Sequence, residues 1–373
     1  MVFFFDDELE CRDICEPKHG FTYFFSNPVK GKYIVRKGIY NQGMFRNLNG
    51  NLQSSGNYIL GINIDSERIL IVYGSASGMV SEKLTFPAPR NENFQYFLSE
   101  ISSQADKLLM ITQAQRLPLP DTVSVSVCGN LDNQSNILTS AADFPQWKNE
   151  SLRSQLSLRF NLPVYVECKA YAGLLAELLF GDLNKRDRVL YINFSPRIRV
   201  GILSGGQLYN NAGGNTGALG NCQVRDPRFS DSDQFKVLND FASGSGLLKF
   251  AKFLHPAHWE DDLSQQSLIQ SALDQDPYAI EVVQEAASLF GRELENLIHI
   301  LRPETLIVGS PFHLLGDLWL KPMTSSLSLA TGLGQGQLPE IISSSLNNRQ
   351  PELESLAPAI ASLRGQNGNS ATN

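Results

Sequence analysis

The sequence predicts an α/β protein of two lobes, because short β-rich runs alternate with amphipathic helical segments along most of the chain. The length of 373 residues suits two domains of roughly 100–200 residues each. With 42% hydrophobic and 18% charged residues the composition is that of a globular protein, and no apolar run is long enough to span a membrane. We therefore expect a folded, cytoplasmic protein.

Residues 58–145 are expected to form the first α/β lobe. Three β-rich runs separated by turn-forming residues predict a meander, and apolar residues at steps of three and four then predict a helix before one more strand. These elements are expected at residues 58–64, 68–74, 79–86, 94–109 and 123–128.

Residues 146–349 are expected to form the second α/β lobe. It begins with the same alternation, at residues 152–160, 164–167, 171–180, 189–194 and 199–203. Its clearest helix starts at Asp276 and Pro277, which suit an N-cap and a first turn, and its apolar stripe runs to Leu301. A C-terminal helix at about 350–364 is expected to return to the first lobe, followed by a disordered tail at 365–373 that has nothing to bury.

The cysteines and the N-terminal charges limit which metals, cofactors and partners are expected. Five cysteines without a Cys-x-x-Cys pair argue against both a disulfide framework and a thiolate metal site, so we expect no bound metal and no cofactor. Residues 17–57 carry six basic residues and no acid in a chain of net charge −7. Such a segment suits an anionic partner, although a solvated loop region explains the charge equally well.

Several short strings, in order and spacing, are similar to those of one family. The chain resembles the ROK family, a bacterial group of sugar kinases and sugar-responsive repressors, over about residues 58–364. The resemblance implies the actin-like, ribonuclease-H-like ATPase fold, with two α/β lobes and a cleft between them. The matching strings lie at residues 59–63, 123–132, 144–147, 162–166, 176–181, 217–220, 226–227 and 302–309.

Both phosphate-binding loops of the family are altered in this chain. Family kinases carry Asp-x-Gly-x-Thr in the first hairpin turn, where residues 63–67 read Asn-Ile-Asp-Ser-Glu. Their second loop, Gly-Thr-Gly-x-Gly-Gly, aligns with residues 195–200, where Pro196 removes an amide donor and bulky residues replace glycines. We expect no productive ATP site.

The catalytic, sugar-binding and zinc-binding positions of the family are also changed. Its catalytic aspartate aligns with Lys169, which cannot accept a proton while it is charged. Its sugar-binding glutamates fall on Ala218 and Asn239, a histidine of the sugar or zinc site falls on Asn221, and the Cys-rich zinc loop is replaced by residues 230–239. The sequence therefore predicts that kinase chemistry has been lost, with no catalytic residue.

Four polar residues are the candidate ligand-binding positions in the cleft: Asp143, Lys169, Asn221 and Asn239. They could equally be solvated residues of the cleft wall. The substitutions raise the local charge by up to about four units, which favours an anionic, sugar-derived ligand. On this hypothesis the Lys169 ammonium holds a carboxylate or phosphate, while Cys128 and Cys168 pack as small apolar residues.

The N-terminal segment, residues 1–57, resembles a reduced winged-helix remnant. Residues 32–38 look like a wing, and Lys30, Lys32, Arg36 and Lys37 are the candidate DNA contacts. Prolines and glycines upstream interrupt what would be the recognition helix. DNA binding is therefore a hypothesis.

The favoured interpretation is a non-catalytic transcriptional regulator of the repressor branch, which senses a sugar-derived ligand or a partner protein and forms a homo-oligomer. One alternative is a glucokinase-like sugar kinase that uses substitute residues. The other is a protein-interaction module that binds no DNA.

Overall fold

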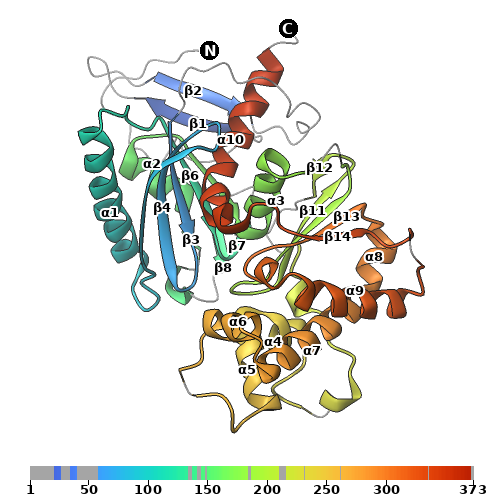
Figure 1. The fold of residues 1–373 in the computed structure, drawn as a ribbon. Coiled ribbons are helices and arrows are strands. Elements are labelled where there is room, and N and C mark those ends of the chain that lie inside the picture. Colours follow the sequence, from blue (N-terminus) through green and yellow to red (C-terminus); the bar gives the residue numbers. More distant parts are fainter. Residues whose placement is uncertain are drawn as a thin grey trace.

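The computed structural model describes most of the chain from residue 58 onward, in two lobes built on two mixed β-sheets (Figure 1). Two N-terminal strands, β1 (Phe21–Ser26) and β2 (Ile34–Ile39), are described as an antiparallel backbone pair only. The described ranges are 58–132, 137–140, 144–147, 149–183, 186–209, 216–230, 232–260, 262–334 and 336–370, the last six residues by backbone alone.

The first sheet has the strand order β5-β4-β3-β6-β9. The strands are β3 (Tyr58–Ile64), β4 (Arg68–Ser75), β5 (Val80–Pro87), β6 (Thr122–Val127) and β9 (Val164–Cys168). Antiparallel pairing of the first three strands confirms the predicted meander, and β3, β6 and β9 run parallel. Helices α1 (Phe94–Ala114) and α2 (Leu152–Phe160) share one core cluster with this sheet.

The strand at 164–168 is a correction to the predicted division at residue 146. The sequence assigned it to the second lobe, but β9 pairs with β6 in the first sheet, with Val164 opposite Val123. Its apolar pattern shows that it is a buried strand and does not show which sheet it joins. Helix α2 is the crossover that a parallel β6–β9 pair requires.

The second sheet has the order β12-β11-β10-β13-β14. Its strands are β10 (Val189–Asn193), β11 (Arg199–Ser204), β12 (Gln207–Leu208), β13 (Thr305–Val308) and β14 (Glu340–Ser343). Helix α3 (Lys169–Phe180) covers one face, where Leu174 packs against Tyr191 and Ile307. A small two-stranded sheet, β7 (Asn130–Asp132) with β8 (Ile137–Ser140), lies beside the first lobe.

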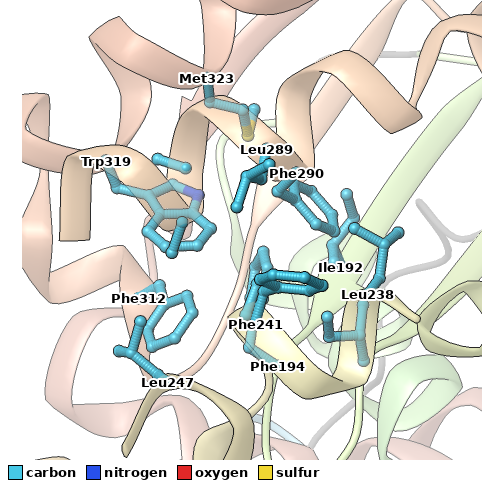
Figure 2. Close-up of a cluster of buried hydrophobic side chains, with 14 of the residues drawn as sticks. Ile192, Phe194, Leu238, Phe241, Leu247, Leu289, Phe290, Phe312, Trp319 and Met323 are labelled. Carbon is cyan, nitrogen blue, oxygen red and sulfur yellow. The ribbon is translucent and has the colours of Figure 1, made fainter. Parts of the chain in front are cut away.

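The other face of the second sheet carries the largest core cluster (Figure 2). Phe194, from the end of β10, packs its ring against Phe312 and Trp319 at centroid distances of 4.6 and 5.2 Å. The covering helices are α4 (Leu238–Ala242), α5 (Gly244–Leu254), α6 (Gln265–Leu273), α7 (Pro277–Glu293), α8 (Glu295–Leu301) and α9 (Asp317–Thr331).

The helix predicted from Asp276 to Leu301 is two helices. Asp276 caps α7 as expected, since its Oδ1 accepts hydrogen bonds from the amides of Tyr278 and Ala279 at 2.8 and 2.9 Å. The chain leaves α7 at Leu294 and starts α8 at the next residue. A continuous apolar stripe does not reveal this break, because both helices bury residues of the same stripe.

Helix α10 (Gln350–Ser370), red in Figure 1, packs against both the first sheet and α3. Leu356 and Ile360 belong to one core cluster with Ile59 of β3, and Leu353 belongs to another with Leu175 of α3. The helix continues past residue 364, so the predicted disordered tail is wrong for 365–370. Glycine weakens a helix but, unlike proline, keeps the backbone N–H that continues its hydrogen bonds.

None of the helices in the described part of the chain is both long and apolar enough to cross a membrane.

Candidate functional site

The candidate site lies where strand ends from both sheets meet the first turn of α3. The β3–β4 turn and the end of β9 meet through Lys169 and Asp65, and β7 meets β11 through Asn130 and Arg199. In open α/β sheets, ligands bind in the crevice outside the carboxyl ends of the strands. This region is therefore the expected position of a ligand.

Lys169 is the first residue of α3, is 5% exposed and forms an ion pair with Asp65 of the β3–β4 turn. Burial acts to lower the pKa of Lys169, but the carboxylates of Asp65 and Glu354 outweigh it and hold the pKa above its ordinary value. Burial likewise acts to raise the pKa of Asp65, and the Lys169 ammonium brings it below its ordinary value. Both groups are charged at neutral pH.

This ion pair bears on both functional interpretations of Lys169. An ammonium with a raised pKa cannot take a proton from a sugar hydroxyl, so it cannot replace the family's carboxylate. An anionic ligand would reach the Lys169 ammonium only if Asp65 moved away from it. The hypothesis that Lys169 holds a carboxylate or phosphate stays a prediction.

A buried polar cluster, which we call the Glu354 joint, lies next to this pair and consists of Asn63, Tyr191, Gln350 and Glu354. Asn63 Nδ2 donates to Glu354 Oε2 at 3.1 Å. The Tyr191 hydroxyl and Gln350 Nε2 donate to Oε1 at 3.2 and 2.8 Å. Burial raises the pKa of Glu354, and the Lys169 charge and the Asn63 hydrogen bond partly oppose this. The joint connects β3, β10 and α10, and so connects both lobes.

Asn221 and Asn239, two of the predicted site residues, are hydrogen-bonded to each other. Asn239 Nδ2 donates to Asn221 Oδ1 at 3.2 Å, and Asn239 Oδ1 accepts from the backbone amide of Ile198 at 2.9 Å. Asn239 therefore holds the β10–β11 loop, while Asn221 is exposed. Among the described residues, no hydrogen bond or ion pair joins either asparagine to Lys169.

The side chains of the remaining predicted site residues are not described. Asp143, Lys30 and Lys32 lie outside the described residues, and Arg36 and Lys37 fall in β2, of which only the backbone is described.

Arg199 lies at the junction of the two lobes and is not among the site residues predicted from the sequence. It begins β11, is half-buried, and donates from both terminal nitrogens to Asn130 Oδ1 at 2.6 and 2.5 Å. Asn130 belongs to β7, so this contact joins the two lobes. Its place in the altered second phosphate loop is a sequence signal for this position, but that signal does not reveal its contact with Asn130.

The two mixed sheets, with α3 and α10 between them, have the two-lobed actin-like architecture that the resemblance implied. A family model described as "ROK family" matches residues 59–351, and the chain belongs to that family. The recognition made from the sequence is confirmed.

Relatives include both regulators and kinases. The chain is 25% identical over 359 residues to the xylose repressor of Caldicellulosiruptor bescii, covering 90% of this chain and 86% of the repressor. It is 22% identical to the DNA-binding transcriptional repressor Mlc of Escherichia coli, covering 62% of this chain and 58% of Mlc.

Solved structures with the same fold also come from both groups. A ROK-family transcriptional regulator described as a homologue of E. coli Mlc gives a TM-score of 0.71 at 17% identity, covering 90% of this chain and 81% of the regulator. A ROK glucokinase from Streptomyces griseus, solved with glucose and AMPPNP, gives 0.69 at 20% identity, covering 81% and 98%. At these identities the likeness shows the fold alone.

Proposed function

We propose that this protein is a non-catalytic transcriptional regulator of the ROK repressor type, acting in the cytoplasm as a homo-oligomer. Its cleft senses a sugar-derived ligand, with Asp143, Lys169, Asn221 and Asn239 as candidate contacts, and its N-terminal segment contacts DNA. The observation that carries the proposal is the buried Lys169–Asp65 ion pair. It fills the position of the family's catalytic carboxylate with a cation and ties that cation to the altered phosphate turn.

The comparison with the xylose repressor supports the regulatory part of the proposal. That match covers 90% of this chain, whereas residues 58–373 make up only about 85% of it. The match therefore extends into the N-terminal segment, residues 1–57. The two strands there, β1 and β2, form an antiparallel hairpin, and β2 carries Arg36 and Lys37. A basic hairpin suits contact with DNA phosphates.

DNA binding is tested by titrating duplex DNA at several salt concentrations. We expect the affinity to fall steeply with salt, and we expect glutamine at Lys30, Lys32, Arg36 and Lys37 together to reduce the salt slope by about 0.9 for each phosphate that is no longer neutralised. Glutamine at four exposed lysines elsewhere, Lys83, Lys107, Lys249 and Lys321, is the matched control. No binding by the intact chain at low salt would contradict the DNA-binding part and favour a protein-interaction module.

A sugar kinase with substitute residues remains the second candidate because of Glu167. This side chain is 5% exposed at the end of β9, and burial raises its pKa to about 7, with the Arg153 charge partly opposing the shift. A carboxyl group with such a pKa can serve as a general base near neutral pH.

The two candidates are separated by incubating the protein with a panel of hexoses and Mg-ATP in a coupled ADP assay. The proposal predicts no sugar-dependent ADP release. Release that depends on one sugar and disappears in Glu167→Gln would establish the kinase and overturn the proposal.

A further inference from the structure

Three polar residues form a row across the first sheet. Asn63 of β3 is directly opposed to Ser126 of β6, and Ser126 is directly opposed to Glu167 of β9. Opposed residues of neighbouring strands project from the same face of a sheet. Ser124, two residues before Ser126, accepts a hydrogen bond from the Ala359 amide of α10 at 3.1 Å. The row therefore lies on the face that α10 covers.

Two side chains of this row have an oxygen atom without a hydrogen-bond partner. Ser126 is fully buried, Glu167 is 5% exposed, and neither Ser126 Oγ nor Glu167 Oε2 forms a hydrogen bond with any described residue. Asn63, by contrast, donates to Glu354 and to the Pro351 carbonyl. A buried polar atom without a partner is costly and calls for an explanation, and here two such atoms belong to adjacent residues. Groups that donate hydrogen bonds would satisfy both.

The row lies beside the candidate site. Glu167 precedes Lys169 by two residues, and Asn63 precedes Asp65 by two. Open α/β sheets bind ligands outside the carboxyl ends of their strands, and Asn63, Ser126 and Glu167 are each the last residue but one of their strand. A sugar carries hydroxyl groups on adjacent carbon atoms, so a single ligand can donate to two neighbouring oxygen atoms.

Glu167 is partly protonated near neutral pH. Burial raises its pKa to about 7, and the charge of Arg153 on α2 only partly opposes this shift. Hydrogen bonds that are donated to a carboxylate favour its ionised form. A ligand that donates to Glu167 therefore displaces a proton from it.

The other ionisable side chains near Glu167 do not replace such a donor. Those on the elements packed against this end of β9 are Asp132, Arg153, Cys168, Lys169, Tyr171 and Glu354. Cys168 and Tyr171 interact electrostatically with Glu167, but burial raises the pKa of both, so both are neutral near neutral pH. Lys169 pairs with Asp65, and Glu354 is bonded within the joint. Among these described groups, Arg153 is thus the one whose charge opposes protonation of Glu167.

We propose that Ser126 and Glu167 form a hydroxyl-binding subsite at the carboxyl ends of β6 and β9, and that a sugar releases the proton of Glu167 when it binds there. One sugar hydroxyl donates to Glu167 Oε2, a neighbouring hydroxyl donates to Ser126 Oγ, and the displaced proton passes to the solvent. The inference rests on the proposed function, because it presumes that the cleft binds a sugar-derived ligand. Water could make the same hydrogen bonds, and the experiment separates the two sources.

The test measures binding of glucose, mannose, galactose and xylose to the intact chain by calorimetry, without ATP, between pH 6 and pH 8. We expect at least one sugar to bind about tenfold more tightly at pH 8 than at pH 6, because a carboxyl group with a pKa of about 7 must ionise. The heat of binding should differ between phosphate and Tris buffers, which reports the released proton. Glu167→Gln should abolish both the pH dependence and the difference between buffers.

Ser126→Ala and Ser124→Ala are a matched pair on the same face of β6. Ser126 Oγ has no described partner to lose, so alanine there should leave the urea midpoint nearly unchanged and weaken sugar binding about two- to tenfold, as for the loss of one hydrogen bond. Ser124 Oγ accepts from the Ala359 amide, so alanine there should lower the urea midpoint and leave sugar binding unchanged.

The outcomes separate failure of the subsite from failure of the proposed function. Sugar binding that is unaltered by Glu167→Gln and by Ser126→Ala in folded variants overturns the subsite and leaves ligand sensing intact, with water as the occupant of this position. Sugar binding by the wild type that does not depend on pH also overturns it. No binding of any of these sugars counts against both the subsite and the sensing of sugars.

Discussion

At the residue scale, Lys169 and Asp65 form an ion pair whose contribution to the stability of the fold can be tested. The Lys169 ammonium and Asp65 are held in a mostly dry site, and removal of one member leaves the other charge buried without its partner. We expect Lys169→Ala to lower the free energy of unfolding by about 3 kcal/mol, the lower end for a buried pair because a quarter of the Asp65 side chain is exposed. Adding Asp65→Asn should recover most of this stability in urea denaturation. A single variant as stable as the wild type would show that the pair is not formed.

Asp226 is a second residue with a testable effect, because its charge should make the stability of the protein depend on pH. It is 8% exposed, and hydrogen bonds from the Arg228 side chain, with further help from Arg292, lower its pKa to about 2. Because the folded-state pKa lies below the unfolded value near 3.8, the stabilisation is complete above about pH 4 and is lost as the pH falls toward 2. We expect Asp226→Asn to be less stable than wild type by up to about 2 kcal/mol at pH 6, an upper bound because Arg228 is half exposed.

The measurement for Asp226 is urea denaturation of both proteins between pH 6 and pH 2.5. The stability difference between them should shrink below pH 4, as the carboxyl group becomes neutral in wild type. A difference that stays constant over this range would mean that the carboxylate charge contributes nothing.

The sequence placed Lys169 at the candidate site but could not supply its partner. Its position followed from the resemblance, in which the family's catalytic aspartate aligns with Lys169. The contact with Asp65 spans 104 positions along the chain, and the Glu354 joint brings Asn63 to a residue 291 positions away. Arg199 was visible as a bulky residue in a glycine-type loop, yet only the register opposite Asn193 shows what it faces.

Among the elements, residues 232–239 contribute a buried aromatic side chain to the core of the second lobe. Phe235, in this segment, is 3% exposed and lies 5.1 Å from Phe241 and 5.6 Å from Phe229 between ring centroids. We expect Phe235→Ala to cost about 3–5 kcal/mol, as for other buried phenylalanines, whereas Phe253→Ala at a 53% exposed position should cost far less. Urea denaturation gives both values.

The same segment should need no metal. Since aromatic contacts are expected to hold it together, EDTA should leave the melting temperature of the protein unchanged. A melting temperature that falls with chelator and recovers with zinc would contradict this expectation and point to ligands other than the family's cysteines.

Elements with a strong local signal were predictable, and their neighbours in space were not. The meander at 58–87 and the capped start of α7 follow from turn residues, alternation and an Asp-Pro pair. The sheet that β9 joins depends on a crossover through α2, and the break at Leu294 depends on packing around two helices that share one apolar stripe. Neither the sheet that β9 joins nor the helix break at Leu294 can be predicted from a short stretch of neighbouring residues.

At the scale of the whole molecule, α3 lies against strands of both sheets, and the Glu354 joint connects α10 to a strand of each sheet. Tyr191, from the second sheet, donates to Glu354 of α10, which also receives a hydrogen bond from Asn63 of the first sheet. A change of lobe arrangement that moves β10 relative to β3 would therefore break hydrogen bonds of this joint.

Tyr191→Phe tests whether the joint couples the lobes, because it removes one hydroxyl and leaves Glu354 and Gln350 buried. We expect a destabilisation of about 1–2 kcal/mol and faster hydrogen exchange in β10, in α10 and in β3. The matched control is Tyr73→Phe, whose buried tyrosine donates to the Pro118 carbonyl within the first lobe at 2.6 Å. The control should be destabilised to a similar extent but speed exchange in the first lobe only. If Tyr191→Phe speeds exchange in β10 alone, the joint is a local contact and the lobes are coupled elsewhere, for which the Arg199–Asn130 contact is the nearest candidate.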